Sequence, residues 1–555
     1  MPMVLETSFL GQILVQGGII AQKLKQNDEL QAQEGAVLST GTAPMAELDA
    51  ELERCERWIA LRPEDAQAHK DRGNALQGLG RPEEAIASYE RAIALDADYA
   101  DAHYNRGNVL NQLGRHELAL ASFERAIELN AQDAQAYNNR GIALQGLGRH
   151  ERAIENFHKA IELSPGYAQA YNNLGLALQK QGRHEQALEC YERALAIMPD
   201  SPEVLTHRGS LYLELGHFPE ALASYQKAVA LRPEYADAHL NEGLCRLLIG
   251  DFECGWRKYE WRLKLDRPGF EYQHFRQPLW LGKEPLEGRT IFLHAEQGLG
   301  DSIQFCRYVP EVARKGAKVI LGVQPTLKRL MSHLQGADQV LSDEEALPEF
   351  DCQCPLLSLP LAFDTRLETI PAAIPYLRAD PGTANKWERR LGSKSAARIG
   401  IVWSGNPEHK NDHNRSVGLS RMLKLASAQV SLVSLQRDVR PEDGELLAQN
   451  RQIIHFGREL TDFYETAALV SLMDLVISVD TSVAHLAGAL GKKVWILLPF
   501  APDWRWLADQ EDSPWYPSAR LFRQPRHGDW DTVIEKVKSE LQSLTLNGRT
   551  QGARG

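Results

Sequence analysis

One glycine-rich loop places a carboxylate directly after two glycines. Residues 294–301 read His-Ala-Glu-Gln-Gly-Leu-Gly-Asp and lie between an expected strand and an expected helix. The N–H groups at Gly298 and Gly300, together with the helix dipole, favour an anion or a sugar hydroxyl. Asp301 is then placed to take a proton from an attacking hydroxyl, although a helix-capping role explains the same residue. The loop lacks the third glycine of the dinucleotide fingerprint and the Gly-Lys-Ser/Thr ending of a phosphate-binding loop, which argues against NAD and ATP.

A second loop joins an apolar strand to a helix within residues 477–491. The strand ends at Asp480, Thr481 and Ser482 begin the helix, and His485 lies one turn further on the same side. The N–H groups of the first turn suit a diphosphate and its attached sugar.

This second loop resembles the donor site of the ADP-heptose:lipopolysaccharide heptosyltransferases, GT-B type enzymes with a strand, Asp-Thr-Gly-x-x-His and a helix. Ser482 stands in place of the family's usual glycine. In that family an aspartate after a glycine-containing loop is the catalytic base, and Asp301 matches its position. The resemblance covers about half of the chain. It implies inversion at the anomeric carbon, no required metal, and a nucleotide sugar as substrate rather than any cofactor.

A third loop, residues 404–416, brings positive charge to the end of another strand. The family has a lysine in this loop that meets the donor phosphates, so Lys410 or Arg415 is expected to stabilise the departing nucleoside diphosphate. A solvated loop is the alternative. His409 and His413 are four residues apart but lack a helix or a carboxylate partner, so no metal site is expected.

Short apolar runs that alternate with amphipathic stretches must position these loops. They predict helices near 301–315, 325–334 and 530–543, and strands at 290–294, 318–323, 339–342, 398–403, 431–436, 453–456, 475–480, 493–499 and 520–523. The pattern predicts a GT-B-like α/β region of two Rossmann-like halves, 286–390 on the acceptor side and 395–545 on the nucleotide-sugar side.

Residues 46–265 carry a repeat of 34 residues. Two glycines recur in register, at positions 73, 107, 141, 175, 209 and 243 and at positions 80, 114, 148, 182, 216 and 250. The first lets two antiparallel helices approach closely, and the second takes the turn between them. Alanines and aromatic residues follow each pair as knob and socket. The repeat resembles the tetratricopeptide (TPR) family and predicts an all-α solenoid of helical hairpins.

Four asparagines, each two residues before the first glycine of its repeat, are expected along the inner surface of the solenoid: Asn105, Asn139, Asn173 and Asn241. Each amide offers a donor and an acceptor, so the row suits an extended peptide backbone. It resembles the asparagine ladder of O-GlcNAc transferase. The alternative is that asparagine is simply common at this repeat position.

The last repeat departs from the pattern. Trp256 and Trp261 occupy positions that are small or polar earlier, which predicts a capping helix that docks on the next domain. Residues 499–506 contain two more tryptophans, whose rings suit stacking on a base or sugar, or packing against the preceding solenoid.

Composition sets the remaining limits. A formal net charge of −12 without a basic stripe argues against nucleic-acid binding. Seven scattered cysteines without a Cys-x-x-Cys pair fit a reducing compartment, and the N-terminus reads as neither signal peptide nor membrane span, so a cytoplasmic location is expected. Residues 1–45 are predicted to be a poorly ordered tether and 546–555 a flexible tail.

The combined expectation is a glycosyltransferase whose solenoid selects a protein or glycan acceptor or binds a protein partner. Two other functions remain open. One is a non-catalytic interaction scaffold with a degenerate glycosyltransferase-like domain, which predicts no donor binding. The other is a nucleotide-sugar epimerase of the GT-B type, which needs acid and base residues in the cleft and no acceptor.

Overall fold

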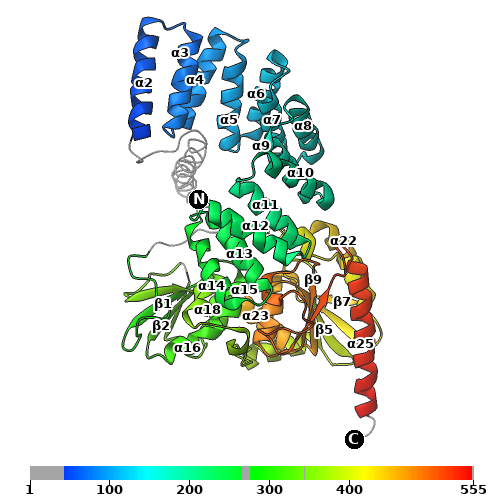
Figure 1. Cartoon of the computed structure of the whole chain (residues 1–555). Coiled ribbons are helices and arrows are strands. Elements are labelled where there is room, and N and C mark those ends of the chain that lie inside the picture. The colour runs from blue at the N-terminus through cyan, green and yellow to red at the C-terminus, as the bar shows by residue number, and fades with distance from the viewer. Residues whose placement is uncertain (1–42, 266–274, 343, 410, 553–555) are drawn as a thin grey trace, which may run out of the picture. The chain divides into compact units, whose positions relative to one another are not determined.

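The computed structural model describes residues 43–265, 275–342, 344–409 and 411–552 (Figure 1). The predicted tether lies almost wholly outside these residues, as do the last three residues of the predicted tail. The chain divides into two compact units, Met1–Leu211 and Tyr212–Gly555, with the boundary inside helix α11. The final helical hairpins therefore belong to the same unit as the α/β region.

The first unit is built of paired helices. They are α2 (Ala43–Leu61), α3 (Ala66–Gly78), α4 (Pro82–Leu95), α5 (Ala100–Gln112), α6 (His116–Leu129), α7 (Ala134–Gly146), α8 (His150–Leu163), α9 (Ala168–Lys180), α10 (His184–Ile197) and the start of α11 (Pro202–Glu214). The second unit continues the pattern with α12 (Phe218–Leu231), α13 (Ala236–Leu248), α14 (Phe252–Tyr259) and the 3-10 turn η1 (Glu260–Lys264).

The two glycines of each repeat have the roles that their spacing predicts. A β-carbon at Gly141 would lie 2.6 Å from the ring of Phe157, so only glycine lets α7 and α8 pack this closely. Gly148 has a φ of 71°, which is strained for any residue with a side chain, and it ends the first helix of its pair. The predicted helical solenoid is confirmed.

The first sheet of the second unit has four parallel strands in the order β3-β2-β1-β4. Its strands are β1 (Thr290–His294), β2 (Lys318–Val323), β3 (Gln339–Ser342) and β4 (Cys352–Pro355). The connecting helices are α15 (Leu299–Phe305), η2 (Cys306–Tyr308), α16 (Val309–Ala313), α17 (Pro325–Met331), η3 (Leu356–Ser358), α18 (Leu359–Ala362) and η4 (Leu367–Thr369). The single helix predicted near 301–315 is broken into three parts, because Pro310 starts a new helix at α16.

The second sheet has six parallel strands in the order β10-β9-β8-β5-β6-β7. Its strands are β5 (Ala397–Val402), β6 (Val430–Ser434), β7 (Ile453–His455), β8 (Leu475–Val479), β9 (Val494–Leu498) and β10 (Ala519–Arg523). The helices are α19 (Pro381–Leu391), which precedes β5, and α20 (Asp412–Arg415), α21 (Leu419–Met422), η5 (Leu423–Leu425), α22 (Pro441–Gln449), η6 (Gly457–Glu459), α23 (Phe463–Ser471), α24 (Ser482–Ala489), η7 (Trp504–Trp506) and α25 (Trp530–Gly552). This strand order is that of a doubly wound nucleotide-binding sheet.

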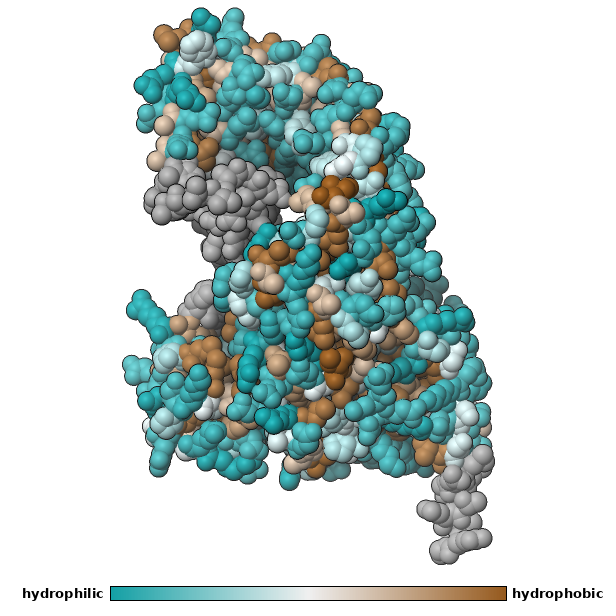
Figure 2. All heavy atoms as spheres, in the orientation of Figure 1, coloured by the Kyte–Doolittle hydropathy of each residue, from teal (hydrophilic) through white to brown (hydrophobic). Residues whose placement is uncertain are grey.

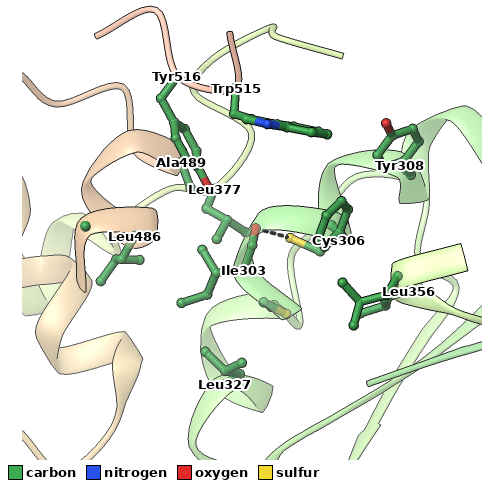
Figure 3. Packing of buried hydrophobic residues seen from close by; sticks show 14 of the residues in the cluster. Ile303, Cys306, Tyr308, Leu327, Leu356, Leu377, Leu486, Ala489, Trp515 and Tyr516 are labelled. Atoms are coloured by element: carbon green, nitrogen blue, oxygen red, sulfur yellow. Dashed lines mark hydrogen bonds between the residues drawn. The ribbon is translucent and has the colours of Figure 1, made fainter. Parts of the chain in front are cut away.

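The two α/β halves share one hydrophobic core. Ile303 and Cys306 of the first half lie near Leu486, Ala489 and Tyr516 of the second, and all are buried (Figure 3). A continuous core fixes the relative position of the loops that each half contributes. The two sets of predicted site residues are thus held by packed elements.

The last repeat is part of this core, as the sequence predicts for a capping helix. The Trp256 indole donates a hydrogen bond to the Thr365 carbonyl oxygen at 3.1 Å, and its ring meets Trp504 edge-on with centroids 5.1 Å apart. Trp261 instead stacks on His239, with ring centroids 3.7 Å apart. Of the two interpretations of residues 499–506, packing is therefore the one seen for Trp504.

The face of the molecule in Figure 2 is covered mostly by hydrophilic residues, with apolar residues in smaller groups. Within the described part of the chain, no helix has the length and apolar character needed to cross a bilayer.

Candidate functional site

The predicted loops lie where parallel sheets bind ligands. In the six-stranded sheet, β5 pairs with β6 on one side and β8 on the other, so the strand order reverses there. The loop after β5 contains Arg415, and β8 is followed by Asp480. In the four-stranded sheet, β1 lies between β2 and β4 and leads into the loop that contains Asp301. Such reversal points open a crevice at the carboxyl ends of the strands.

The glycine-rich loop of the first half packs against the donor loop of the second. Helices α15 and α24 are in direct contact, and a β-carbon at Gly300 would lie 2.9 Å from Cδ2 of His485 and 3.6 Å from Cα of Ser482. Glycine at this position therefore permits the two helix starts to meet. The structure brings together the two groups of residues that the sequence singles out separately.

Asp301 has two partners. Its Oδ2 accepts a hydrogen bond from the Gly298 N–H at 2.9 Å, so the side chain does cap α15. Its Oδ1 accepts a hydrogen bond from the Arg505 guanidinium, which comes from η7 of the other half. Burial raises the pKa of Asp301 above its ordinary value, while the Arg505 charge opposes this increase. Capping occupies Oδ2, so a role in proton transfer requires Oδ1, the oxygen that pairs with Arg505.

His485 is buried beside two aromatic residues. Its Nδ1 lies 3.0 Å from the Tyr516 hydroxyl, and its ring stacks on Trp506 with centroids 5.2 Å apart. Burial and the charges of Arg505, Arg307 and Arg415 lower the pKa of His485 well below its ordinary value.

Asp480 is affected by arginines from two loops, Arg415 and Arg505. Burial raises the pKa of its carboxyl to about 6, and the negative charge of Asp503 adds to this, whereas Arg415 and Arg505 oppose it. Arg415 donates a hydrogen bond to the Asp480 carbonyl oxygen at 3.2 Å. Thr481 is the N-cap residue of α24, but its hydroxyl lies 3.0 Å from Ser478 Oγ and makes no cap bond to the described first turn.

The loop after β5 is folded around a buried carboxylate. Asp412 is 4% exposed and pairs with both Arg415 and Arg440. The backbone of Gly405 packs closely on the Arg415 guanidinium, since a β-carbon there would lie 2.6 Å from Nη2. The structure thus places Arg415 beside the donor loop, while Lys410 lies outside the described residues.

Arg505 and a second buried cluster are not identified by the sequence patterns. Arg262 of η1 is fully buried, and its guanidinium donates to both carboxylate oxygens of Glu296, at 3.2 and 2.9 Å. Arg262 also pairs with Glu260 and donates to Ser358 Oγ at 2.7 Å. Since Glu296 precedes Gly298 by two residues, this cluster ties the glycine-rich loop to the last repeat.

Three of the four asparagines join neighbouring repeats of the first unit. The amide nitrogens of Asn105, Asn139 and Asn173 donate to the side-chain oxygens of Asn74, Asn108 and Asn138, at 2.9, 2.8 and 3.0 Å. The fourth residue of the predicted row, Asn241, is partly buried on α13 of the second unit. Inter-repeat bonding is therefore one function of these amides, and peptide binding stays a prediction.

The raised pKa of Asp480 predicts a pH-dependent cost in stability. The pKa of this carboxyl is about 6 in the folded chain and 3.8 at its ordinary value, so the folded state binds the proton more tightly than the unfolded state does. The stability that this proton contributes is fully present below pH 3.8 and is lost as the pH rises through about 6. We expect Asp480→Asn to raise the free energy of unfolding at pH 7.5 by about 1–3 kcal/mol, since one pKa unit corresponds to about 1.4 kcal/mol. The gain should shrink towards pH 5, as thermal melting of both proteins across this range would measure. An equal melting temperature at pH 7.5 would contradict a desolvated carboxyl at this position.

Comparison with known proteins finds two kinds of family match in the chain. Residues 70–134, 132–200 and 166–234 match tetratricopeptide repeat families, and residues 419–498 match glycosyltransferase family 9 (heptosyltransferase). The latter match includes Asp480 and His485 but neither Asp301 nor Arg505. Protein FlbA of Caulobacter vibrioides is 24% identical over an alignment of 322 residues that covers 53% of this chain and 53% of FlbA. The chain therefore spans about half the length of this curated relative.

Two solved structures are similar to part of the chain. The crystal structure of MamA is 26% identical, covers 30% of this chain and 97% of its own, and has a TM-score of 0.27. The structure of YrrB, described as a TPR protein with an unusual peptide-binding site, is 24% identical, with coverages of 34% and 96% and a TM-score of 0.29. The sequence matches place tetratricopeptide repeats, within residues 70–234, before a segment, residues 419–498, of the glycosyltransferase family 9 (heptosyltransferase) type.

Proposed function

We propose that the α/β region is a glycosyltransferase of the GT-B type that moves a sugar from a nucleotide-sugar donor to an acceptor. The observation that carries this proposal is the direct packing of the Asp301 loop on the Asp480–His485 loop, seen at Gly300. A base from one half and a diphosphate-binding helix start from the other then face the same crevice, as transfer between two bound molecules requires.

In this proposal each residue has one role. The diphosphate binds at the first turn of α24, where the N–H groups and the helix dipole favour negative charge. Arg415 stabilises the charge that develops on the leaving diphosphate, and Lys410 is a second candidate for this role. Asp301 takes the proton of the acceptor hydroxyl as that oxygen attacks the anomeric carbon. The family resemblance implies inversion, independence of metal ions and no cofactor.

The repeats supply the acceptor side of the proposal. A groove lined by amide side chains suits a protein acceptor or partner held in an extended conformation, and an acceptor glycan is the alternative substrate.

A non-catalytic scaffold is the second candidate, and one observation favours it. Both oxygens of Asp301 are engaged, by Gly298 and by Arg505, as in a carboxylate with a purely structural role. This function predicts that no nucleotide sugar binds.

Ligand binding distinguishes the two. We expect one class among UDP-, GDP-, ADP- and CMP-linked sugars to raise the melting temperature of the full chain, because a ligand that binds only the folded state stabilises it. The same donor should not stabilise the double variant Asp480→Ala/His485→Ala. Arg421→Gln, which loses an exposed ion pair with Asp531, is the matched control and should behave as the wild type. If no donor shifts the wild type, the scaffold function is favoured and the transferase proposal fails.

A further inference from the structure

Arg505 links the two halves at the candidate site. It lies at the centre of η7, is only 8% exposed, and forms ion pairs with Asp301 of the first half and Asp503 of its own loop. Its guanidinium also lies over the Trp504 ring, 4.3 Å from the centroid. Trp504 is in turn packed on Trp256, so the base of this arginine is rigid.

The Arg505 guanidinium retains bonding capacity. Its buried Nε has no hydrogen-bond acceptor among the residues that the structure describes. A buried N–H without an acceptor is unfavourable, and a planar guanidinium is suited to bind two phosphate oxygens at once. Asp503 holds the arginine in place, because its Oδ1 accepts from both the Arg505 backbone N–H and Nη1, at 3.0 and 2.8 Å.

Arg505 is one of two arginines beside the donor loop. Arg505 and Arg415 both act on the Asp480 carboxyl, and Asp480 directly precedes the N-cap residue of α24. Arg415 also donates a hydrogen bond to the Asp480 carbonyl oxygen. Arg505 pairs with Asp301, whose neighbour Gly300 packs on Ser482, so both guanidinium groups lie near the start of α24. The carboxylates of Asp301, Asp480 and Asp503 would repel a diphosphate unless a cation moved from a carboxylate to the phosphates.

Resting on the proposed function, we propose that Arg505 binds the diphosphate of the donor and in doing so releases Asp301. Without a donor the guanidinium neutralises the Asp301 carboxylate and weakens it as a base. A bound diphosphate competes for the same guanidinium, so Asp301 is freed only when the donor is in place. The ion pair thus couples binding of the donor to activation of the base. The donor must therefore bind before Asp301 can deprotonate the acceptor.

A double-mutant cycle tests this competition. UDP, GDP and ADP are titrated by calorimetry into the full-length wild type, Arg505→Gln, Asp301→Asn and the double variant at one pH and ionic strength. We expect the nucleotide that binds best to lose about tenfold or more in affinity with Arg505→Gln, because a charge-assisted contact is lost. Asp301→Asn should bind it several-fold more tightly than wild type, since the competing carboxylate is gone. This gain should largely disappear in the double variant.

The cycle separates the inference from the proposed function. A wild type that binds none of the three nucleotides overturns both. Nucleotide binding that is unchanged in Arg505→Gln, or a gain from Asp301→Asn that persists undiminished in the double variant, overturns only the role of Arg505. An Asp301→Asn variant that binds no more tightly than wild type overturns the competition even if Arg505→Gln is unstable. Arg421→Gln again serves as the control.

Discussion

Replacing Asp301 by asparagine is expected to lower the rate of sugar transfer about 10²- to 10⁴-fold, the usual contribution of a general base. Asparagine keeps an oxygen that can accept the capping bond from the Gly298 N–H, so α15 should remain intact. The rate is measured as release of free nucleotide from the donor class that the binding screen identifies. Because burial raises the pKa of Asp301, the wild-type rate should increase with pH through a value above the ordinary 3.8.

An exposed carboxylate provides the control for this variant. Asp531 of α25 has a side chain that is 56% exposed and pairs only with Arg421 and Lys424 among the ion pairs of the described residues, so Asp531→Asn should retain most of the turnover. Full turnover in Asp301→Asn would place the base elsewhere and leave Asp301 as a helix cap. A lower rate together with a lower melting temperature of the variant would likewise indicate a structural role for Asp301.

The sequence predicts the strands closely because each is short, apolar and bounded by polar loops. The predictions at 290–294, 318–323 and 339–342 coincide with β1, β2 and β3. It misses β4, Cys352–Pro355, since four residues that end in proline carry neither alternation nor β-branched side chains. This strand matters for the site, because it lies beside β1 at the point where the strand order reverses.

The individual loops are equally visible in the sequence, but their partners are not. Gly300 and His485 are recognisable within their own segments, whereas their contact depends on how two halves pack. Arg505 lies 204 residues from Asp301 along the chain. The tryptophans of its loop predict ring stacking or packing, and the pattern does not predict an ion pair. Burial, which sets the pKa values at the site, is likewise a property of the packed unit rather than of any motif.

The last repeat contacts the surroundings of the candidate site at two places. Trp256 of α14 packs on Trp504, the residue next to Arg505, while Arg262 of η1 holds Glu296 near the start of the glycine-rich loop. Asp301 lies between these two supports. The repeat that ends the solenoid is therefore an integral part of the α/β unit rather than a separate cap.

This support predicts a large loss of stability in Arg262→Met. The variant leaves Glu296 and Glu260 without their buried counter-charge, and breaking a buried pair in this way costs about 3–5 kcal/mol. Burial already raises the pKa of Glu296 despite the arginine, so its carboxylate tolerates the loss poorly. The change is measured as the shift in the urea transition of the second unit, followed by tryptophan fluorescence.

Two further variants separate the ion pair from the packing of the helix. Arg257→Met removes an arginine of α14 whose side chain is 62% exposed, and it should alter stability by less than about 1 kcal/mol. Arg262→Met combined with Glu296→Leu removes both main charges and should recover much of the loss, because apolar side chains then fill the buried site. Nucleotide release should remain low even in the recovered protein, since Glu296 no longer ties the Asp301 loop to the Leu357 N–H. An Arg262→Met variant as stable as Arg257→Met would mean that the last repeat does not support the glycine-rich loop through this pair.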